Sequence, residues 1–298
     1  AQAAQIPVAI VNARLSEQSA RGYQKLRCFL RKPMDRVLQG ITLVAAQSRS
    51  CAERFERLGI PAERIALTGS VKFDGAESNR DNPLSVRLRE AAAIRPDQRV
   101  FVAGSTQAPE EEIVLEAYES LLREFPQLRL ILVPRHPERG HEIAQLLSRR
   151  GLPFWRRSEH AASPINQQPR KPISQAHNSL GSPPEPRTVP HPVMLVDIVG
   201  ELGGWWGCAD VGFVGGSLGS RGGQNMLEPS AYGVATCFGP NTRNFRDIVE
   251  QLLAAEAAVV VSDGEELLNF CQKCLRNARF RTQLGLRAKN VVQAQRGA

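Results

Sequence analysis

The feature that most restricts the possible folds is the repeated alternation of short apolar runs with helix-like segments. Runs such as Ile41–Ala46, Val100–Ala103 and Leu128–Val133 each lead into polar or glycine residues and then into a helical pattern. Apolar runs of this length, separated by helices, are typical of the strands of a parallel sheet. The sequence therefore predicts an α/β protein in which helices cover parallel sheets.

A polar segment over residues 75–98 divides this pattern into two parts. We predict that residues 1–80 form part of an N-terminal Rossmann-like domain and that residues 81–298 form a second domain. The chain has no initiator Met, and a strand-like run, Pro7–Asn12, comes almost at once without a preceding turn or cap. We therefore expect the chain to begin inside a domain whose earlier portion lies upstream.

Residues 159–192 differ from the rest of the second part in composition. They hold eight of the 20 prolines of the chain, together with many Ser, Asn and Gln residues. Such a segment cannot bury enough apolar surface to order itself. We predict a flexible insertion that contributes little to function.

The net charge of +8 is concentrated near the start of the chain. Residues 1–74 contain twelve Lys or Arg and six Asp or Glu. A basic patch there could meet nucleic acid, an anionic membrane surface or a phosphorylated substrate, and could equally be an ordinary solvated face. Few aromatic residues accompany the charges, which argues against binding of single-stranded nucleic acid.

Targeting and redox signals are few. No apolar run approaches the roughly 18 residues of a membrane-spanning helix, and no signal peptide is visible. The six cysteines are scattered through apolar segments, which favours a reducing compartment over a disulfide framework. Cys271 and Cys274 form one CxxC without a second pair or nearby histidines, so we expect two half-buried cysteines on one helix rather than a zinc site.

The stretch from Phe213 to Gly233 is the strongest candidate for a binding loop. It reads FVGGSLGSRGGQNMLEPSAYG, in which an apolar run meets one glycine pair, a second pair follows, and an expected helix carries Asn225 and Glu228. Glycines are needed where a backbone turns with positive φ or approaches a ligand, and a helix start offers free N–H groups to an anion. We interpret this stretch as a phosphate loop followed by a carboxylate that accepts the two hydroxyl groups of a ribose.

Other predicted strands end in segments of the same kind. GST at residues 104–106 and PRHPER at residues 134–139 follow two apolar runs. Ligands of open parallel sheets bind outside the carboxyl ends of the strands, so these loops are expected to converge on one phosphate-bearing ligand. Together with Glu228, this pattern predicts a sugar-nucleotide site.

Several other chemistries find no support in the motifs. There is no nucleophile elbow of the GxSxG type, no Walker A pattern and no GxGxxG directly after a strand, and three of the five histidines fall in the predicted insertion. A hydrolase triad, nucleoside triphosphate hydrolysis and dinucleotide redox chemistry are therefore disfavoured.

Nine short blocks, in the same order along the chain, resemble the 3-deoxy-D-manno-octulosonic acid (Kdo) transferase family. They cover nearly the whole chain apart from the insertion, which makes the set far more specific than any one block. The blocks are NARLSEQS (12–19), AQS (46–48), TGSVKFD (68–74), GST (104–106), VPRHPER (133–139), GEL (200–202), FVGGSL (213–218), GGQNMLEP (222–229) and GPNTRNFRDI (239–248).

This resemblance implies a GT-B glycosyltransferase with two Rossmann-like parallel-sheet domains, the first incomplete in this chain. It implies transfer of Kdo from CMP-Kdo to a lipid A precursor in lipopolysaccharide biosynthesis, without a cofactor or metal. The expected location is the cytoplasmic face of the bacterial inner membrane, peripheral or anchored through the upstream region. An anionic membrane surface is then the expected partner of the basic patch, and no nucleic acid is expected.

The resemblance also assigns roles to residues. The GEL block would face the cytosine, Arg135 and His136 would bind the donor or its phosphate, and Asn225 and Glu228 would contact phosphate and ribose. The full donor set is Ser105, Thr106, Arg135, His136, Gly200, Glu201, Leu202, Gly216, Ser217, Gly222, Gly223, Asn225 and Glu228, and the acceptor-side candidates are Arg14, Ser16, Ser48 and Lys72.

Three positions depart from the pattern of the family. Gln107 and Gln224 stand where the family usually has His, and Ser70 stands where it usually has Asn. Glutamine keeps hydrogen bonding but cannot carry positive charge, which bears on donor affinity and donor identity. The family's catalytic base, a glutamate in an early GE motif, has no counterpart in this sequence, so we expect this chain to bind the donor without transferring it.

The implied reaction is an inverting displacement at the anomeric carbon, in which Arg135 and helix N-termini stabilise the departing CMP. Two alternatives remain. Another GT-B nucleotide-sugar enzyme, a UDP-sugar transferase or epimerase, would share the glycine loops and the ribose carboxylate. A basic nucleic-acid-binding module fits the charge but not the α/β pattern.

Overall fold

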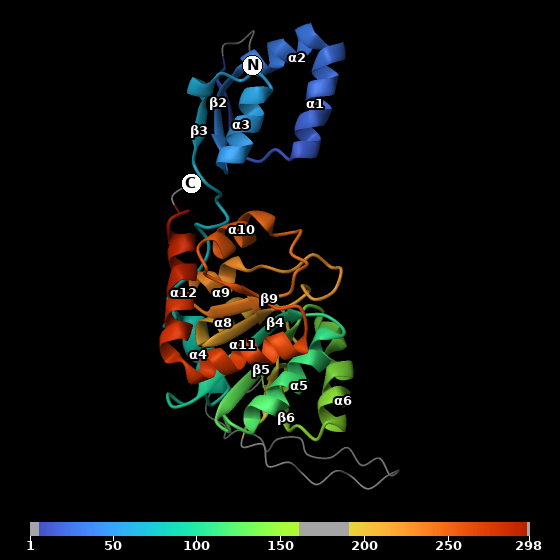
Figure 1. The fold of residues 1–298 in the computed structure, drawn as a ribbon, viewed down its shortest axis with the longest axis vertical. Coiled ribbons are helices and arrows are strands. Elements are labelled where there is room, and N and C mark those ends of the chain that lie inside the picture. The colour runs from blue at the N-terminus through green and yellow to red at the C-terminus, as the bar shows by residue number, and fades with distance from the viewer. Residues whose placement is uncertain (1–5, 161–190, 297–298) are drawn as a thin grey trace. The chain divides into compact units, whose positions relative to one another are not determined.

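The computed structural model describes residues 6–160 and 191–296 (Figure 1). Most of the predicted insertion, residues 161–190, lies outside the described residues. The chain divides into two compact units. One holds the chain up to Ala76 together with the segment from Val292 onward, and the other runs from Glu77 to Val291.

The smaller unit is built on a three-stranded parallel sheet with the order β1-β2-β3. Helices begin where the sequence provides caps, since the hydroxyl groups of Ser16 and Ser48 accept the N–H groups of Ser19 and Cys51. Its elements are β1 (Val8–Ala13), α1 (Glu17–Phe29), α2 (Arg31–Gln39), β2 (Ile41–Ala46), α3 (Arg49–Arg57) and β3 (Ile65–Leu67).

The larger unit contains a seven-stranded parallel sheet with the order β10-β9-β8-β4-β5-β7-β6. Its central strands are buried along their whole length, which is why they read as continuous apolar runs in the sequence. The strands are β4 (Arg99–Thr106), β5 (Leu128–Pro134), β6 (Phe154–Arg156), β7 (Val193–Leu195), β8 (Val211–Val214), β9 (Ala235–Phe238) and β10 (Val259–Val260).

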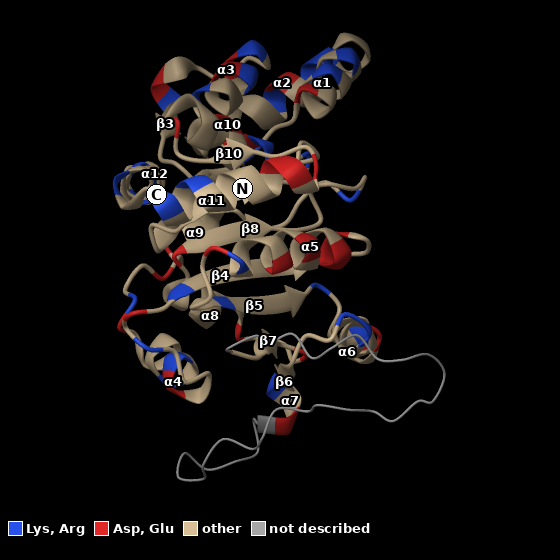
Figure 2. Cartoon of the chain, turned by 60° about the horizontal axis from the view of Figure 1, so that its bottom comes forward, with Lys and Arg blue, Asp and Glu red and all other residues tan. Residues whose placement is uncertain are grey.

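Helices cover both faces of this sheet. In Figure 1, α5 and α11 lie side by side in front of the strands, and α4 packs against α8. Lys, Arg, Asp and Glu gather on the helices and loops around the sheet (Figure 2). The helices are α4 (Pro83–Ala91), α5 (Glu110–Leu122), α6 (Gly140–Arg149), α7 (Arg157–His160), α8 (Leu202–Cys208), α9 (Leu227–Ala231), α10 (Arg246–Ala254), α11 (Gly264–Arg276) and α12 (Ala278–Gln293).

The predicted α/β class with parallel sheets is confirmed, and the differences are local. The run from Val193 to Val199 continues as a strand only to Leu195. Asn225 precedes α9 instead of lying on it, and α2 was not expected from the sequence. Among the described residues, no helix is both long and apolar enough to cross a membrane.

Candidate functional site: a cavity at the switch point of the large sheet

The strand order of the large sheet reverses at β4. From β4 the chain moves outward through β5 to β6 and returns through β7, then continues through β8 on the other side of β4. Loops diverge at such a switch point and leave a crevice at the carboxyl ends of the strands. A cavity of about 410 Å³ lies there, lined by Ser105, Arg135, Gly200, Leu202, Gly203, Trp206, Val214, Gln224, Asn225 and Glu228.

Asn225 and Glu228 form one wall of this cavity and are tied to each other. The Asn225 side-chain amide donates to Oε1 of Glu228 at 2.9 Å, while its Oδ1 accepts the Leu227 N–H at 3.0 Å. Burial raises the pKa of the Glu228 carboxyl, and the hydrogen bond from Asn225 opposes part of that shift. The second oxygen, Oε2, has no hydrogen bond to a described residue and is free to accept from a ligand hydroxyl.

Arg135 also lines the cavity and lies directly after β5. Its backbone N–H donates to the Thr106 carbonyl at 2.9 Å, which joins the ends of β4 and β5. The guanidinium is exposed at the cavity, and no described acidic residue pairs with it. His136, predicted beside it, does not line the cavity, and its Nδ1 lies 3.3 Å from Oε1 of Glu138.

The GEL block contributes two of its three residues to the cavity. Gly200, with φ of +91°, and Leu202 line it. Glu201 does not, because both of its carboxylate oxygens accept from Arg157 at 2.8 Å. This bidentate ion pair attaches the GEL turn to the segment after β6.

The GGSL segment after β8 does not offer its N–H groups to a ligand. The amides of Gly216, Ser217 and Leu218 donate to Glu110 at 2.7, 2.9 and 3.0 Å, and Gln107 N–H adds a fourth bond at 2.9 Å. Glu110 is 1% exposed, so the anion held by this loop is a protein carboxylate. The structure thus contradicts our interpretation of GGSL as a phosphate-binding loop.

Gly216 and Ser217, both in the predicted donor set, have their hydrogen-bonding groups bonded to other residues of the protein. The Ser217 hydroxyl donates to the Val214 carbonyl at 2.6 Å and accepts the Gly239 N–H at 2.8 Å. No expectation drawn from the sequence connected Glu110 with this loop. Glu110 precedes GGSL by more than a hundred residues, so no local signal links it to that loop.

The ends of β4 and β8 meet closely beneath the cavity. Ser105 has φ of +56° and lines the cavity, whereas Thr106 is fully buried and its hydroxyl has no described hydrogen-bond partner. A Cβ at Gly104 would overlap the Trp206 ring and stand 2.9 Å from Leu202. The glycine therefore lets Trp206, a buried core residue, also line the cavity.

The second glycine pair, Gly222 and Gly223, has φ of +93° and +78° and is buried in the loop before α9. Gly222 lies against the segment after β9 and does not line the cavity. Gly223 N–H donates to the Gly216 carbonyl at 2.7 Å, so the two glycine pairs are joined directly.

The two Gln residues that depart from the family's pattern lie against the same glycine. A Cβ at Gly216 would stand 3.1 Å from Nε2 of Gln107 and 3.2 Å from Nε2 of Gln224. Gln224 also lines the cavity. Two neutral amides therefore stand together where the family's pattern has two titratable rings.

The four acceptor-side candidates all belong to the smaller unit. Ser16 and Ser48 act as N-caps of α1 and α3, which accounts for both hydroxyl groups. Arg14 and Lys72 are exposed. The basic excess of this unit is partly compensated, since Glu17 accepts from both Arg54 and Arg57 at 3.1 Å.

The cysteines of the large unit are part of its hydrophobic core. Cys271 and Cys274 are 1% and 0% exposed, and burial raises the pKa of both thiols. Within the described segments, no three His, Cys, Asp or Glu side chains are grouped so as to hold a metal ion.

The chain has two units with parallel sheets, and the larger has a cavity at a strand switch point. These features define a chain with the GT-B fold. A putative UDP-N-acetylglucosamine 2-epimerase from Listeria monocytogenes shares this fold, with a TM-score of 0.52 and 10% identity over 98% of this chain and 67% of that one.

Comparisons of sequence give the family. The family model for 3-deoxy-D-manno-octulosonic-acid transferase matches residues 1–75. A Kdo transferase from Haemophilus influenzae is 33% identical over 98% of this chain and 62% of its own length. One from Bordetella pertussis is 31% identical over 100% of this chain and 63% of its own length. The C-terminal CMP-Kdo binding domain of WaaA from Acinetobacter baumannii is 30% identical, with a TM-score of 0.58 over 70% of this chain and 96% of that domain. The chain belongs to the Kdo transferase family and spans somewhat under two thirds of the length of these curated relatives.

Proposed function

We propose that the larger unit binds CMP-Kdo, as the donor-binding part of an enzyme that transfers Kdo from this donor to a lipid A precursor in lipopolysaccharide biosynthesis. The observation that carries the proposal is the cavity at the switch point, whose lining includes Glu228, held by Asn225, and also Arg135, which has no ion pair among the described residues. Glu228 would accept the ribose hydroxyls and Arg135 would bind the phosphate. The Acinetobacter relative, described as a CMP-Kdo binding domain, supports this choice of donor.

Arg135 would provide most of the stabilisation of the departing CMP. The helices that begin at the cavity are short, seven residues in α8 and five in α9, so their dipoles contribute little. A guanidinium provides two parallel donors to a phosphate and keeps its charge at any physiological pH. No metal or cofactor is part of the proposed mechanism.

The general base that deprotonates the acceptor is not assigned to this chain. The resemblance implies a glutamate in an early GE motif, which this sequence lacks, and the curated relatives are longer than this chain. We therefore propose that the 298 residues bind the donor but do not transfer it. Appreciable Kdo transfer by the isolated chain would contradict this part of the proposal.

An anionic membrane surface is the proposed partner of the smaller unit. Phe29, Leu30 and Val37 at the ends of α1 and α2 are 87%, 50% and 64% exposed, and exposed basic residues accompany them on these helices (Figure 2). Apolar side chains beside Lys and Arg favour the headgroup region of an anionic bilayer. The proposed location is the cytoplasmic face of the inner membrane.

The donor proposal is tested by calorimetric titration of the chain with CMP and with UDP. We expect CMP to bind more tightly than UDP. Glu228→Ala should lower the affinity for CMP by roughly tenfold or more, since a hydrogen bond to a charged group contributes about 1.5–3 kcal/mol. Glu138→Ala, an exposed carboxylate outside the cavity, is the control and should leave CMP affinity unchanged. Preference for UDP would instead favour a UDP-sugar enzyme of the same fold.

A further inference from the structure

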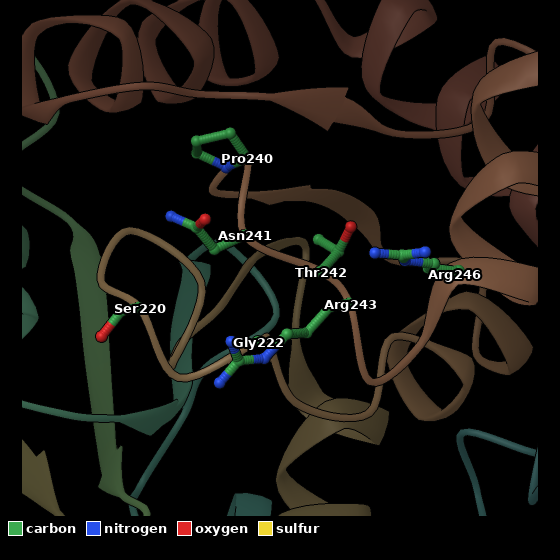
Figure 3. A pocket seen from close by; sticks show the side chains of 7 residues that line it. All are labelled: Ser220, Gly222, Pro240, Asn241, Thr242, Arg243 and Arg246. Carbon is green, nitrogen blue, oxygen red and sulfur yellow. The ribbon is translucent and has the colours of Figure 1, made fainter. Parts of the chain in front are cut away.

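A second pocket lies beside the proposed donor cavity and is not used by it. It has a volume of about 330 Å³ and is formed between the loop before α9 and the loop that follows β9. Figure 3 shows its lining, in which Arg243 comes from the second loop and Arg246 from the start of α10. We call it the arginine pocket and define it by Ser220, Gly222, Asn241, Thr242, Arg243 and Arg246.

The walls of the arginine pocket are joined by hydrogen bonds, so its shape is preformed. Asn241 N–H donates to the Ser217 carbonyl at 3.0 Å, and Asn244 N–H donates to the Gly222 carbonyl at 3.0 Å. The Asn244 side-chain amide adds a bond to the Arg221 carbonyl at 3.0 Å.

Glycine at position 222 is needed for this close approach of the two loops. A Cβ there would stand 2.7 Å from Cγ of Arg243 and 2.7 Å from Nδ2 of Asn244, and its φ of +93° disfavours any other residue. Gly222 thus serves the arginine pocket, although the sequence pattern alone assigned it to the nucleotide.

The positive charge of the arginine pocket has no ion-pair partner among the described residues. Arg243 and Arg246 are both exposed, and neither forms an ion pair in the part of the chain that the structure describes. Arg221, also exposed, adjoins Gly222 and adds to the positive field. Arg243 and Arg246 line the pocket together with Thr242 and Asn241, and Figure 3 draws the Arg246 guanidinium toward Thr242 and that of Arg243 toward Gly222. Such a lining favours an oxyanion, which arginine binds with two parallel donors.

The arginine pocket and the donor cavity share one loop. Gly222 lines the former, while Gln224 and Asn225 line the latter. An anionic group in the arginine pocket would therefore belong to a molecule at or next to the bound nucleotide.

We propose that the arginine pocket binds an oxyanion carried by a reactant, either the carboxylate of the donor sugar or a phosphate of the acceptor. This inference rests on the proposed function for the identity of the reactants. The only oxyanion of CMP is the phosphate, which is assigned to Arg135. If the pocket binds the donor carboxylate, the protein should therefore bind CMP-Kdo more tightly than CMP.

The test compares the wild-type chain with the double variant Arg243→Gln, Arg246→Gln by calorimetric titration. The ligands are CMP, CMP-Kdo, and inorganic phosphate added to the CMP-saturated protein. Arg123→Gln, an exposed arginine at the far end of α5 without an ion pair among the described residues, controls for the change of charge.

If the donor carboxylate occupies the pocket, wild type binds CMP-Kdo more tightly than CMP. The double variant should then bind CMP-Kdo roughly tenfold or more weakly than wild type does, while its affinity for CMP stays the same. If an acceptor phosphate occupies it, CMP-saturated wild type binds inorganic phosphate and the double variant does not. Equal behaviour of the double variant and wild type toward both ligands overturns the inference. Failure of wild type to bind CMP would overturn the proposed function instead, so the two failures are distinguishable.

Discussion

Glu110 organises the loop of the candidate site although it touches no ligand-accessible surface. Its two carboxylate oxygens accept four backbone N–H groups, three of them from residues 216–218. Four charge-assisted bonds compensate for the burial of one charge, and they hold the end of β8 against the start of α5. Glu110 is therefore a positioning residue for the Gly216–Gln224 wall of the cavity.

Replacing Glu110 with Gln should destabilise the protein by about 2–4 kcal/mol, because the new amide group would face N–H donors that then lack an acceptor. CMP affinity should fall as well, and amide hydrogen exchange at residues 216–218 should accelerate. Glu112→Gln is the matched control, since this neighbouring glutamate is exposed and should tolerate the change within about 0.5 kcal/mol. A variant that loses stability but keeps protected 216–218 amides would contradict the positioning role.

Glu228 combines an expected binding role with a cost in stability. Its pKa is raised by burial, so the folded state favours the protonated carboxyl more than the unfolded chain does. The stability contributed by that preference is fully present below the unfolded value of 4.5 and is lost as pH rises through the higher folded pKa. At neutral pH the buried carboxylate is therefore a destabilising group in the free protein.

Glu228→Gln should accordingly raise Tm relative to wild type at pH 7, and the difference should shrink as pH falls toward 4. The same substitution should weaken CMP, which separates stability from binding. Thermal melts of both proteins between pH 4 and 8 measure the effect. A Tm difference independent of pH would show that ionisation of Glu228 is not its origin.

The packing of α8 on β4 decides whether the cavity can exist. Gly104 is the point of closest approach, where Trp206 and Leu202 occupy the space of a side chain. Both residues also line the cavity, so a shift of α8 alters the floor of the site directly.

Gly104→Ala should destabilise the protein by about 1–3 kcal/mol through overpacking and should weaken CMP binding as α8 moves. Gly219→Ala is the control, because no atom lies within 4 Å of the position of its Cβ. Urea denaturation gives the stability of each variant, and titration with CMP gives the affinity. Unchanged stability of Gly104→Ala would mean that α8 is not held against β4 as described.

The two units differ in the size of their cores. One hydrophobic cluster of the larger unit contains 27 described buried residues, whereas the cluster of the smaller unit contains nine, with Val11, Leu43 and Leu67 of its sheet left exposed. Since buried apolar area is the main source of stability, the smaller unit should unfold first.

Calorimetry should therefore resolve two transitions, and CMP should raise only the upper one. A ligand at a hundred times its Kd stabilises the folded state by about 2.7 kcal/mol, and only the unit that binds it gains. The control is UDP at the same concentration, which should shift the upper transition less. A shift of the lower transition by CMP would place the nucleotide in the smaller unit and contradict the proposed donor site.

Much of the molecule could be predicted from residue patterns alone. Buried strands are uniformly apolar, helix caps such as Ser16 and Ser48 are local signals, and loops at the ends of parallel strands share one rim, so the α/β class and the switch-point residues followed from the sequence. The rim argument predicted Ser105, Arg135, Asn225 and Glu228 in one cavity, whereas Gly200 and Leu202 were expected there only from the resemblance.

Tertiary structure decided what each polar group in those loops actually faces. Glu201 binds Arg157, the GGSL amides bind Glu110, and Gly222 faces a second pocket, all through residues distant in sequence or in a neighbouring loop. Hydrogen-bond partners depend on three-dimensional proximity, and the same glycine and carboxylate residues can serve a ligand or another part of the chain. The sequence alone therefore determined where a binding site would lie, while the folded structure determined which groups remain free to bind.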